Sequence, residues 1–171
     1  MRRRRSGRFF AARLATARTA AGLASGAKAE EWPRYHNERF GATADYPAGW
    51  TTEPAPENND GRRFVSPDGR ASLTISGIFA TDSRNAELDE KATPMPGETV
   101  TYRAARDNWI VLSGTRNGRI FYRKAILSCG GEVWNDLDID YPVEEKTEYD
   151  ALAAHIAASL RPGSGYDLKC K

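Results

Sequence analysis

The sequence predicts an α+β domain made of an antiparallel sheet of about six to seven strands, packed by a C-terminal amphipathic helix. Two patterns predict it. Apolar and polar residues alternate in short segments between residues 39 and 142, and turn residues separate these segments, as in half-buried antiparallel strands. After Pro142 the apolar period lengthens to about 3.6, which is typical of a helix with one buried face.

The expected strands follow one another along the chain. The first begins at Arg39 and ends at Pro47-Ala48-Gly49, and a loop is expected over 51–60. The later strands are expected at 62–66, 70–79, 99–105, 109–114, 119–129 and 134–142. Pro67-Asp68-Gly69 and Asn117-Gly118 are the strongest turn signals between them.

Helical segments are expected at two places. Residues 81–97 are polar, and at most two helical turns are expected around 85–91 before Pro94. In the closing helix, Thr147 with Asp150 resembles an N-terminal capping arrangement, and Pro162-Gly163 ends the helix. Its apolar face is formed by Tyr149, Leu152, Ala153, Ile156 and Leu160.

The chain is expected to divide into a basic head (1–29), a single α+β domain (30–162) and a short tail (163–171). The head holds eight of the 25 basic residues and none of the 23 acidic ones, and it ends in Ala27-Lys28-Ala29, which fits the small-x-small rule for signal cleavage. We therefore expect a signal peptide and a periplasmic or secreted protein. An organelle presequence and a basic arm are the alternatives.

Charge and hydropathy limit the partners. Outside the head, 17 basic and 23 acidic residues give a formal net charge of −6, which argues against binding to nucleic acid. No uncharged run approaches the roughly 20 apolar residues that span a bilayer, so we expect no transmembrane segment. A monomer is expected.

Cys129 and Cys170 are the only cysteines in the chain. In an exported protein they permit one disulfide, which would tie the tail to the domain. Two unrelated thiols are the alternative. Their spacing suits neither a zinc site nor a redox Cys-x-x-Cys pair.

The segment "WNDLDIDYP" (134–142) raises the question of a metal site, because it places carboxylates at every second position: Asp136, Asp138 and Asp140. A calcium loop starting at Asp136 would need Gly at its sixth position and Glu at its twelfth, where the chain has Tyr141 and Thr147. No metal is therefore expected.

Strand alternation explains the same residues more simply. It turns Leu137 and Ile139 to the core and the three aspartates to solvent, where Arg123 and Lys124 on a neighbouring strand are expected to offset their charge. Trp134 shares the aspartates' face. Together with Asp136, Asp138 and Asp140 it forms a candidate partner surface, or the site of a small-ligand or metal carrier.

No catalytic constellation is evident, and we assign neither catalytic residues nor a cofactor. The two histidines, His36 and His155, are expected at solvated or edge positions. The chain has no nucleophile elbow, zinc-binding helix motif or phosphate-binding glycine loop. A hydrolase with residues assembled from distant positions stays an alternative.

Several segments together resemble the PsbP-like group, which includes the Mog family of Ran-binding proteins and many small exported bacterial proteins. They are "FGATADYPAGW" (40–50), "RRFVSPDGRASLTISG" (62–77), Tyr102, Tyr141-Pro142 and "YDALAAHIAASLR" (149–161). The resemblance implies a sheet sandwiched by helices. It also implies action by binding other macromolecules, and it carries over no catalytic residue. We therefore expect a non-enzymatic, exported binding or accessory domain acting on a protein or envelope partner.

Overall fold

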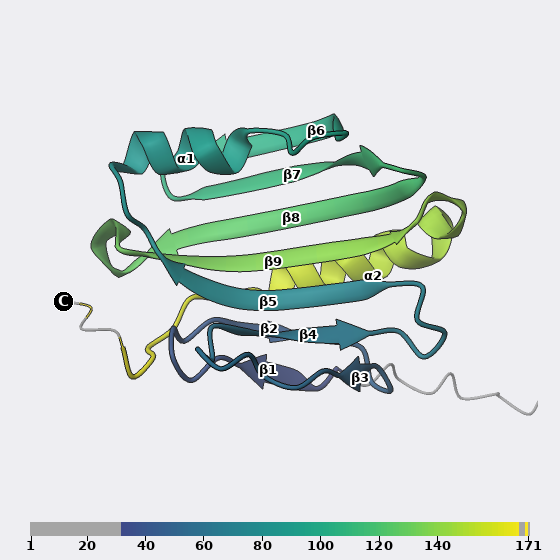
Figure 1. Ribbon diagram of the computed structural model, residues 1–171, viewed down its shortest axis with the longest axis horizontal. Helices are drawn as coiled ribbons and strands as arrows, with labels where there is room; N and C mark the ends of the chain where they lie inside the picture. Colours follow the sequence, from purple (N-terminus) through teal and green to yellow (C-terminus); the bar gives the residue numbers. More distant parts are fainter. Residues whose placement is uncertain (1–31, 168–169, 171) are drawn as a thin grey trace, which may run out of the picture.

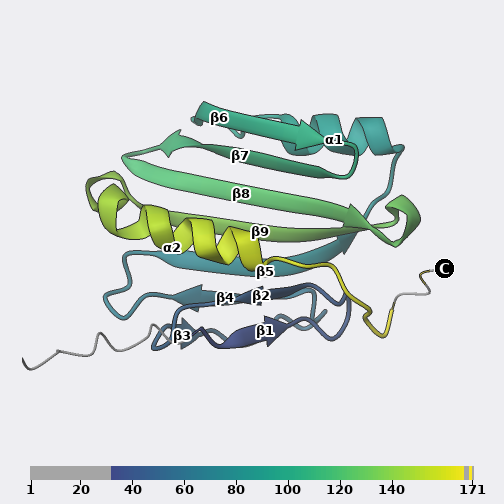
Figure 2. The same ribbon diagram turned by 180° about the vertical axis from the view of Figure 1, so that it is seen from behind.

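The computed structural model describes residues 32–167 and Cys170, and at its centre lies a seven-stranded antiparallel sheet. Helix α1 (Arg84–Ala92) lies on one face of this sheet, as Figure 1 shows, and helix α2 (Lys146–Ser159) lies across the other, as Figure 2 shows from behind. The predicted α+β fold is confirmed. The predicted head, 1–29, lies outside the described residues.

Each strand pairs antiparallel with its neighbours. In spatial order the strands are β3 (Thr51–Thr52), β4 (Gly61–Val65), β5 (Ser72–Phe79), β9 (Val133–Pro142), β8 (Arg119–Ser128), β7 (Trp109–Arg116) and β6 (Thr99–Arg106). A separate two-stranded sheet is formed by β1 (Arg34–His36) and β2 (Thr43–Asp45). Short 3-10 turns, η1 (Cys129–Gly131) and η2 (Val143–Glu145), precede β9 and α2. The strands expected from residue 62 onwards end within two residues of the observed limits.

The beginning of the domain differs from the expectation. A tight turn interrupts the strand expected from Arg39: Asn37 accepts the backbone N–H of Phe40 through its side-chain oxygen at 2.7 Å, and Gly41 has a φ of 81°. The ordered strand is therefore only β2. The sequence also gave no sign of β1 and β3, because two or three residues are too few to show a period.

The α2 face of the sheet carries the larger apolar core. Leu137 and Ile139 of β9 are buried there, as predicted, and Ile156 of α2 packs in the same cluster. The helix begins at Lys146 as a continuation of η2, and no side chain caps it, so the predicted Thr147–Asp150 cap is wrong. Asp150 instead accepts the hydroxyl of Tyr141 at 3.1 Å.

The C-terminal tail returns to the start of the domain. Arg161 forms an isolated bridge with Thr43, and the Tyr166 N–H donates to the carbonyl of Glu38 at 2.9 Å. Beyond this contact, Cys170 lies at disulfide distance from Cys129, with the Cα atoms 4.7 Å apart. The tail is thus held at both ends.

Candidate functional site

The aspartate row of β9 lies on the α1 face of the sheet. Asp138 is opposite Thr74 on β5 and Arg123 on β8, so it occupies the middle of the sheet. Asp136 and Asp140 flank it on the same face. The expected shared face is observed, but the aspartates are only partly open to solvent, because Asp136 pairs with Lys91 of α1 and both Asp136 and Asp138 line a cavity with α1 and the segment after it.

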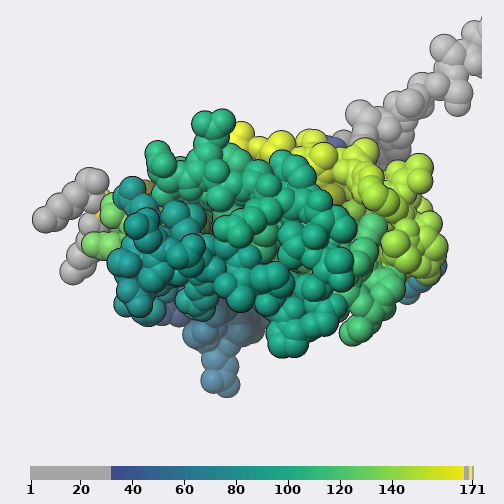
Figure 3. Space-filling model, turned by 90° about the horizontal axis from the view of Figure 1, so that it is seen from above, coloured from purple at the N-terminus to yellow at the C-terminus, as the bar shows by residue number. Residues whose placement is uncertain are grey.

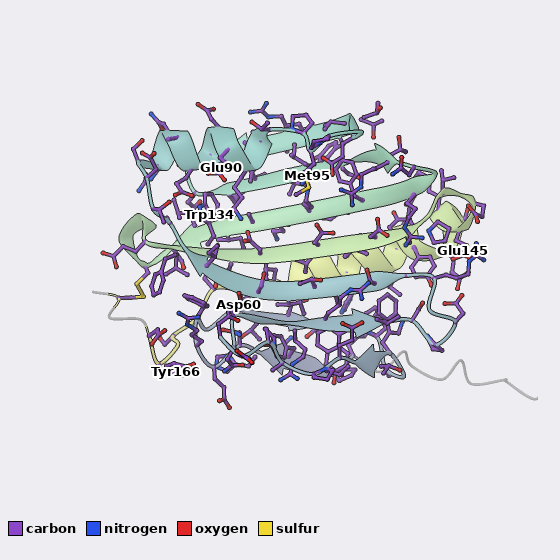
Figure 4. The ribbon with its side chains drawn as sticks, viewed as in Figure 1. Asp60, Glu90, Met95, Trp134, Glu145 and Tyr166 are labelled. Carbon is purple, nitrogen blue, oxygen red and sulfur yellow. A yellow bond between two sulfur atoms is a disulfide. The ribbon has the colours of Figure 1, made fainter. Side chains whose placement is uncertain are left out.

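Trp134 belongs to the protein interior and not to the surface. Its side chain, labelled in Figure 4, has 0% exposure. Its indole Nε1–H donates to Glu87 Oε2 of α1 at 2.8 Å. A covered indole cannot contact a partner. The expectation that Trp134 forms part of a partner surface is therefore wrong, and its role is to hold α1 on the sheet.

Glu87 is the residue that anchors α1. Its other carboxylate oxygen accepts the backbone N–H groups of Thr81 at 2.6 Å and Asp82 at 2.9 Å. Burial by itself would raise the pKa of Glu87, but these two donors and the Trp134 indole bring it below its ordinary value. The carboxylate therefore stays charged and ties the start of α1 to β9.

One turn after Glu87, Lys91 reaches the sheet. Its ammonium nitrogen lies 2.6 Å from Asp136 Oδ2 and 5.5 Å from the centroid of the Trp134 ring. The spacing of four residues places Glu87 and Lys91 on one side of the helix. That spacing was the sequence signal that could have identified the side of α1 turned to the sheet.

A cavity of about 660 Å³ opens beside this contact. Asp136, Asp138 and Arg123 line this cavity. Met95, which belongs to the segment after α1 and is labelled in Figure 4, lines it as well. The complete lining is Thr74, Ser76, Glu90, Lys91, Thr93, Pro94, Met95, Ile110, Leu112, Arg123, Lys124, Ala125, Asp136, Leu137 and Asp138. Apolar and charged groups thus share one cavity of the size that small ligands occupy, about 300–1,000 Å³.

Arg123 is held in this lining by a buried acid. Its Nη2 lies 2.6 Å from Glu98 Oε2, and the Glu98 side chain is only 1% exposed. Arg116 lies 3.5 Å from the other oxygen of Glu98. The Nε of Arg123 is buried and has no partner within the described part of the chain.

Asp138 is the acid of β9 that lines the cavity without a direct partner. Burial raises its pKa to about 6, against the opposing charge of Arg123. Among residues 32–167 its carboxylate accepts no hydrogen bond and has no ion pair within 4.0 Å. Burial also raises the pKa of Asp136, although Lys91 opposes that effect. Two acids near the middle of one strand therefore differ, since only Asp138 lacks a direct partner.

Asp140 lies outside the cavity lining. It pairs with Arg119 on β8, and Arg119 also donates to the Arg70 carbonyl at 2.7 Å. Lys124, which was expected beside the aspartates, points to the opposite face and donates to the carbonyl of Ala157 in α2 at 2.6 Å. Of the two basic residues predicted to offset the charge of the aspartates, only Arg123 lies on their face of the sheet.

The histidines lie away from the cavity. The ring of His155 stacks on Trp32, with centroids 3.9 Å apart, and its Nε2 lies 3.2 Å from Asp45 Oδ2. His36 Nδ1 lies 3.1 Å from the hydroxyl of Thr43. Both histidines are partly exposed at the edge of the domain, as predicted.

Within 32–167 and Cys170, no group of three or more His, Cys, Asp or Glu side chains is placed to hold a metal ion. In the same part of the chain, no helix has the length and apolar character needed to cross a bilayer.

Comparison with known proteins identifies the fold. No protein-family model and no curated protein sequence matches the chain. Among solved structures, cyanobacterial PsbP (CyanoP) from Synechocystis sp. PCC 6803 is similar with a TM-score of 0.57 and 13% identity, over 83% of this chain and 98% of that one. The Ran-binding protein Mog1p from Saccharomyces cerevisiae is similar with a TM-score of 0.53 and 8% identity, over 78% and 96%. LpqN from Mycobacterium tuberculosis, involved in cell envelope biogenesis, is similar with a TM-score of 0.48 and 18% identity, over 80% of this chain and 93% of that one.

These likenesses cover nearly the whole length of the neighbours, at identities that bear on the fold alone. The neighbours include a PsbP and a Mog protein, the two kinds that the segments quoted above resemble. The chain therefore has the PsbP-like fold that the sequence predicted.

Proposed function

We propose that this chain is an exported, non-catalytic binding domain that engages an envelope component through the cavity under α1. The observation that carries the proposal is Asp138, an acid of that cavity without a direct partner. Its carboxylate has no ion pair within the described residues, and burial raises its pKa. A ligand that donates a hydrogen bond to this carboxylate restores part of the solvation that it has lost and so gains affinity.

The cavity also defines what the ligand presents. A group that donates a hydrogen bond to Asp138, such as an amide or a hydroxyl, satisfies this carboxylate. Met95, Ile110 and Leu112 supply apolar contacts next to these charges. Lys91 and Glu98 are already paired with neighbouring side chains, so they hold the polar groups in place.

Crosslinking from the cavity tests the proposal. A photoreactive residue at Met95, which is 48% exposed, is compared with one at Val143, which is 44% exposed at the far end of β9. In native envelopes we expect a discrete crosslinked product from position 95 alone, and its loss when Asp138→Leu is added. Equal products from both positions, or a product insensitive to Asp138→Leu, would contradict the proposed site.

Export is supported by two separate features. The basic head ends in a cleavage-like motif, and the cysteines lie at disulfide distance, which suits an oxidising compartment. Mass spectrometry of protein from the native host should find a chain that begins near Glu30 with Cys129 linked to Cys170. A retained Met1 with both thiols free would remove the claim.

A hydrolase is the second candidate, and the raised pKa of Asp138 favours it. A carboxyl group with a pKa of about 6 inside a cavity can take up or release a proton near neutral pH. Turnover on an unbiased substrate panel that falls with Asp138→Asn and follows a pKa near 6 would establish catalysis. Ligand binding without turnover would leave the binding domain as the function.

A further inference from the structure

The second feature that invites a partner is the free edge of the sheet at β6. This strand is eight residues long and pairs only with β7, so its outer row of N–H and C=O groups has no backbone partner in the described chain. At the opposite edge β3 is only two residues long. Figure 3 views the molecule from the β6 side and shows this edge facing outwards, uncovered by either helix.

The edge is well formed over most of its length. Its pairing with β7 is irregular only between Val100 and Tyr102, and from Tyr102 to Arg106 the register is continuous. Tyr102 is 55% exposed. Natural edge strands are often blocked by charged side chains, by proline, by irregular pairing or by a covering segment, and the charged residues of β6 are two arginines, which oppose pairing with another basic strand. β6 contains no proline, and its irregularity is confined to the start of the strand.

The charge of this edge is opposite to that of the domain. Residues 30–171 carry a formal net charge of −6, whereas β6 carries Arg103 and Arg106 and no acid. Arg84 at the start of α1 adds a third cation beside the end of β6, where it lines a hollow with Arg106 and Leu88. None of the three arginines has an ion pair within the described residues.

We propose that β6 is a docking edge for an extended, acidic segment of a partner protein, which adds to the sheet as a further antiparallel or parallel strand. Main-chain hydrogen bonds to β6 provide the affinity, and carboxylates beside Arg103 on one face of the sheet and beside Arg106 on the other select the segment. A second copy of the chain is a poorer occupant, because pairing β6 with itself brings two basic strands together. This inference does not depend on the cavity under α1.

The test uses the full chain and three synthetic peptides of about eight residues. One is a Val-rich peptide with two Glu residues three positions apart, so that its carboxylates reach both faces of the sheet as Arg103 and Arg106 do; the second has Lys at these positions, and the third is the Glu peptide with every backbone nitrogen methylated. We expect only the first to bind, with slower hydrogen exchange of the amides of 102–106. The methylated peptide keeps the charge but cannot form the main-chain ladder, so equal binding of both acidic peptides would overturn the proposal.

Variants of the protein separate this edge from other surfaces. Arg103→Glu with Arg106→Glu is expected to weaken binding of the acidic peptide about tenfold or more and to favour the Lys peptide. Arg63→Glu, an exposed change on β4, and Asp138→Leu in the cavity should leave the affinity unchanged. The proposal of an acidic partner is refuted if the acidic peptide does not bind. It is also refuted if the wild-type chain self-associates and the double variant Arg103→Glu, Arg106→Glu abolishes that self-association.

Discussion

The two faces of the sheet are built from the same strands but serve different ends. On the α2 face, β9 presents Leu137 and Ile139 to a closed apolar core beneath Ile156. On the α1 face, alternate residues of the same strand present Trp134 to α1 and Asp136 and Asp138 to a cavity. The α2 face therefore provides most of the stability, and the α1 face retains charged groups with room beside them.

The difference between the faces comes from the helices that cover them. α2 has 14 residues and buries four of them against the sheet. α1 has nine residues, and it is held on the sheet by two polar contacts, from Glu87 to Trp134 and from Lys91 to Asp136, and by a smaller apolar cluster that includes Ala92 and Leu88. A short helix with polar anchors leaves part of its sheet face uncovered, and the cavity occupies that part.

The largest effect is expected on the α2 face. Ile156→Ala removes a fully buried side chain from the apolar core and should lower the free energy of unfolding by about 3–4 kcal/mol. Urea denaturation at neutral pH measures it. A loss below about 1 kcal/mol would mean that the α2 face is not the main source of stability.

The anchor of α1 should give the next largest effect. Glu87→Ala leaves the Trp134 indole and two backbone N–H groups without their acceptor, and we expect a loss of about 2–3 kcal/mol. The pKa of Glu87 is lowered on folding, so its contribution is present above its ordinary pKa of 4.5 and is lost as the pH falls below it.

Glu87→Gln provides the matched control for that anchor. The amide keeps the shape but not the charge, so the variant should lose less stability than the wild type between pH 5 and pH 3. Denaturant titrations across this range compare the two proteins. Parallel pH profiles would show that the charge of Glu87 does not contribute.

Asp138 should show the opposite sign. Its pKa is raised from 3.8 to about 6, so the folded protein binds more protons than the unfolded chain between these values and loses stability as the pH rises through them. Asp138→Asn should therefore raise the free energy of unfolding by about 1–2 kcal/mol at pH 8 and by little at pH 4. Asp140→Asn, which breaks the pair with Arg119, should give no such gain. An equal gain at both pH values would contradict the burial of the Asp138 charge.

The smallest effect is expected at the rim of the cavity. Met95→Ala removes a half-exposed side chain that lines the cavity without closing a core, and unfolding should change by less than about 0.5 kcal/mol. Compared with Ile156→Ala, this truncation measures the difference between the two faces directly. A loss similar to that of Ile156→Ala would place Met95 in a core.

The sequence predicted the fold better than the site, for a physical reason. Alternation along 134–142 determines which residues share a face, and it placed Leu137 and Ile139 in the core correctly. It contains no information on what covers the other face. The burial of Trp134 depends on Glu87, which is 47 residues earlier, and the raised pKa of Asp138 depends on the same cover. β1 and β3 were missed for a related reason, since their pairing and not their own pattern makes them strands.

The C-terminal tail has a consequence for the order of assembly. Residues near the start of the domain, Glu38 and Thr43, obtain hydrogen-bond partners from Tyr166 and Arg161, which the ribosome adds only after all the strands of the sheet. Cys129 likewise obtains its partner only from Cys170. If the chain crosses a membrane from its N-terminus, the domain can be completed only after residues 161–170 have followed, and the two cysteines can be oxidised to a disulfide only from that point on.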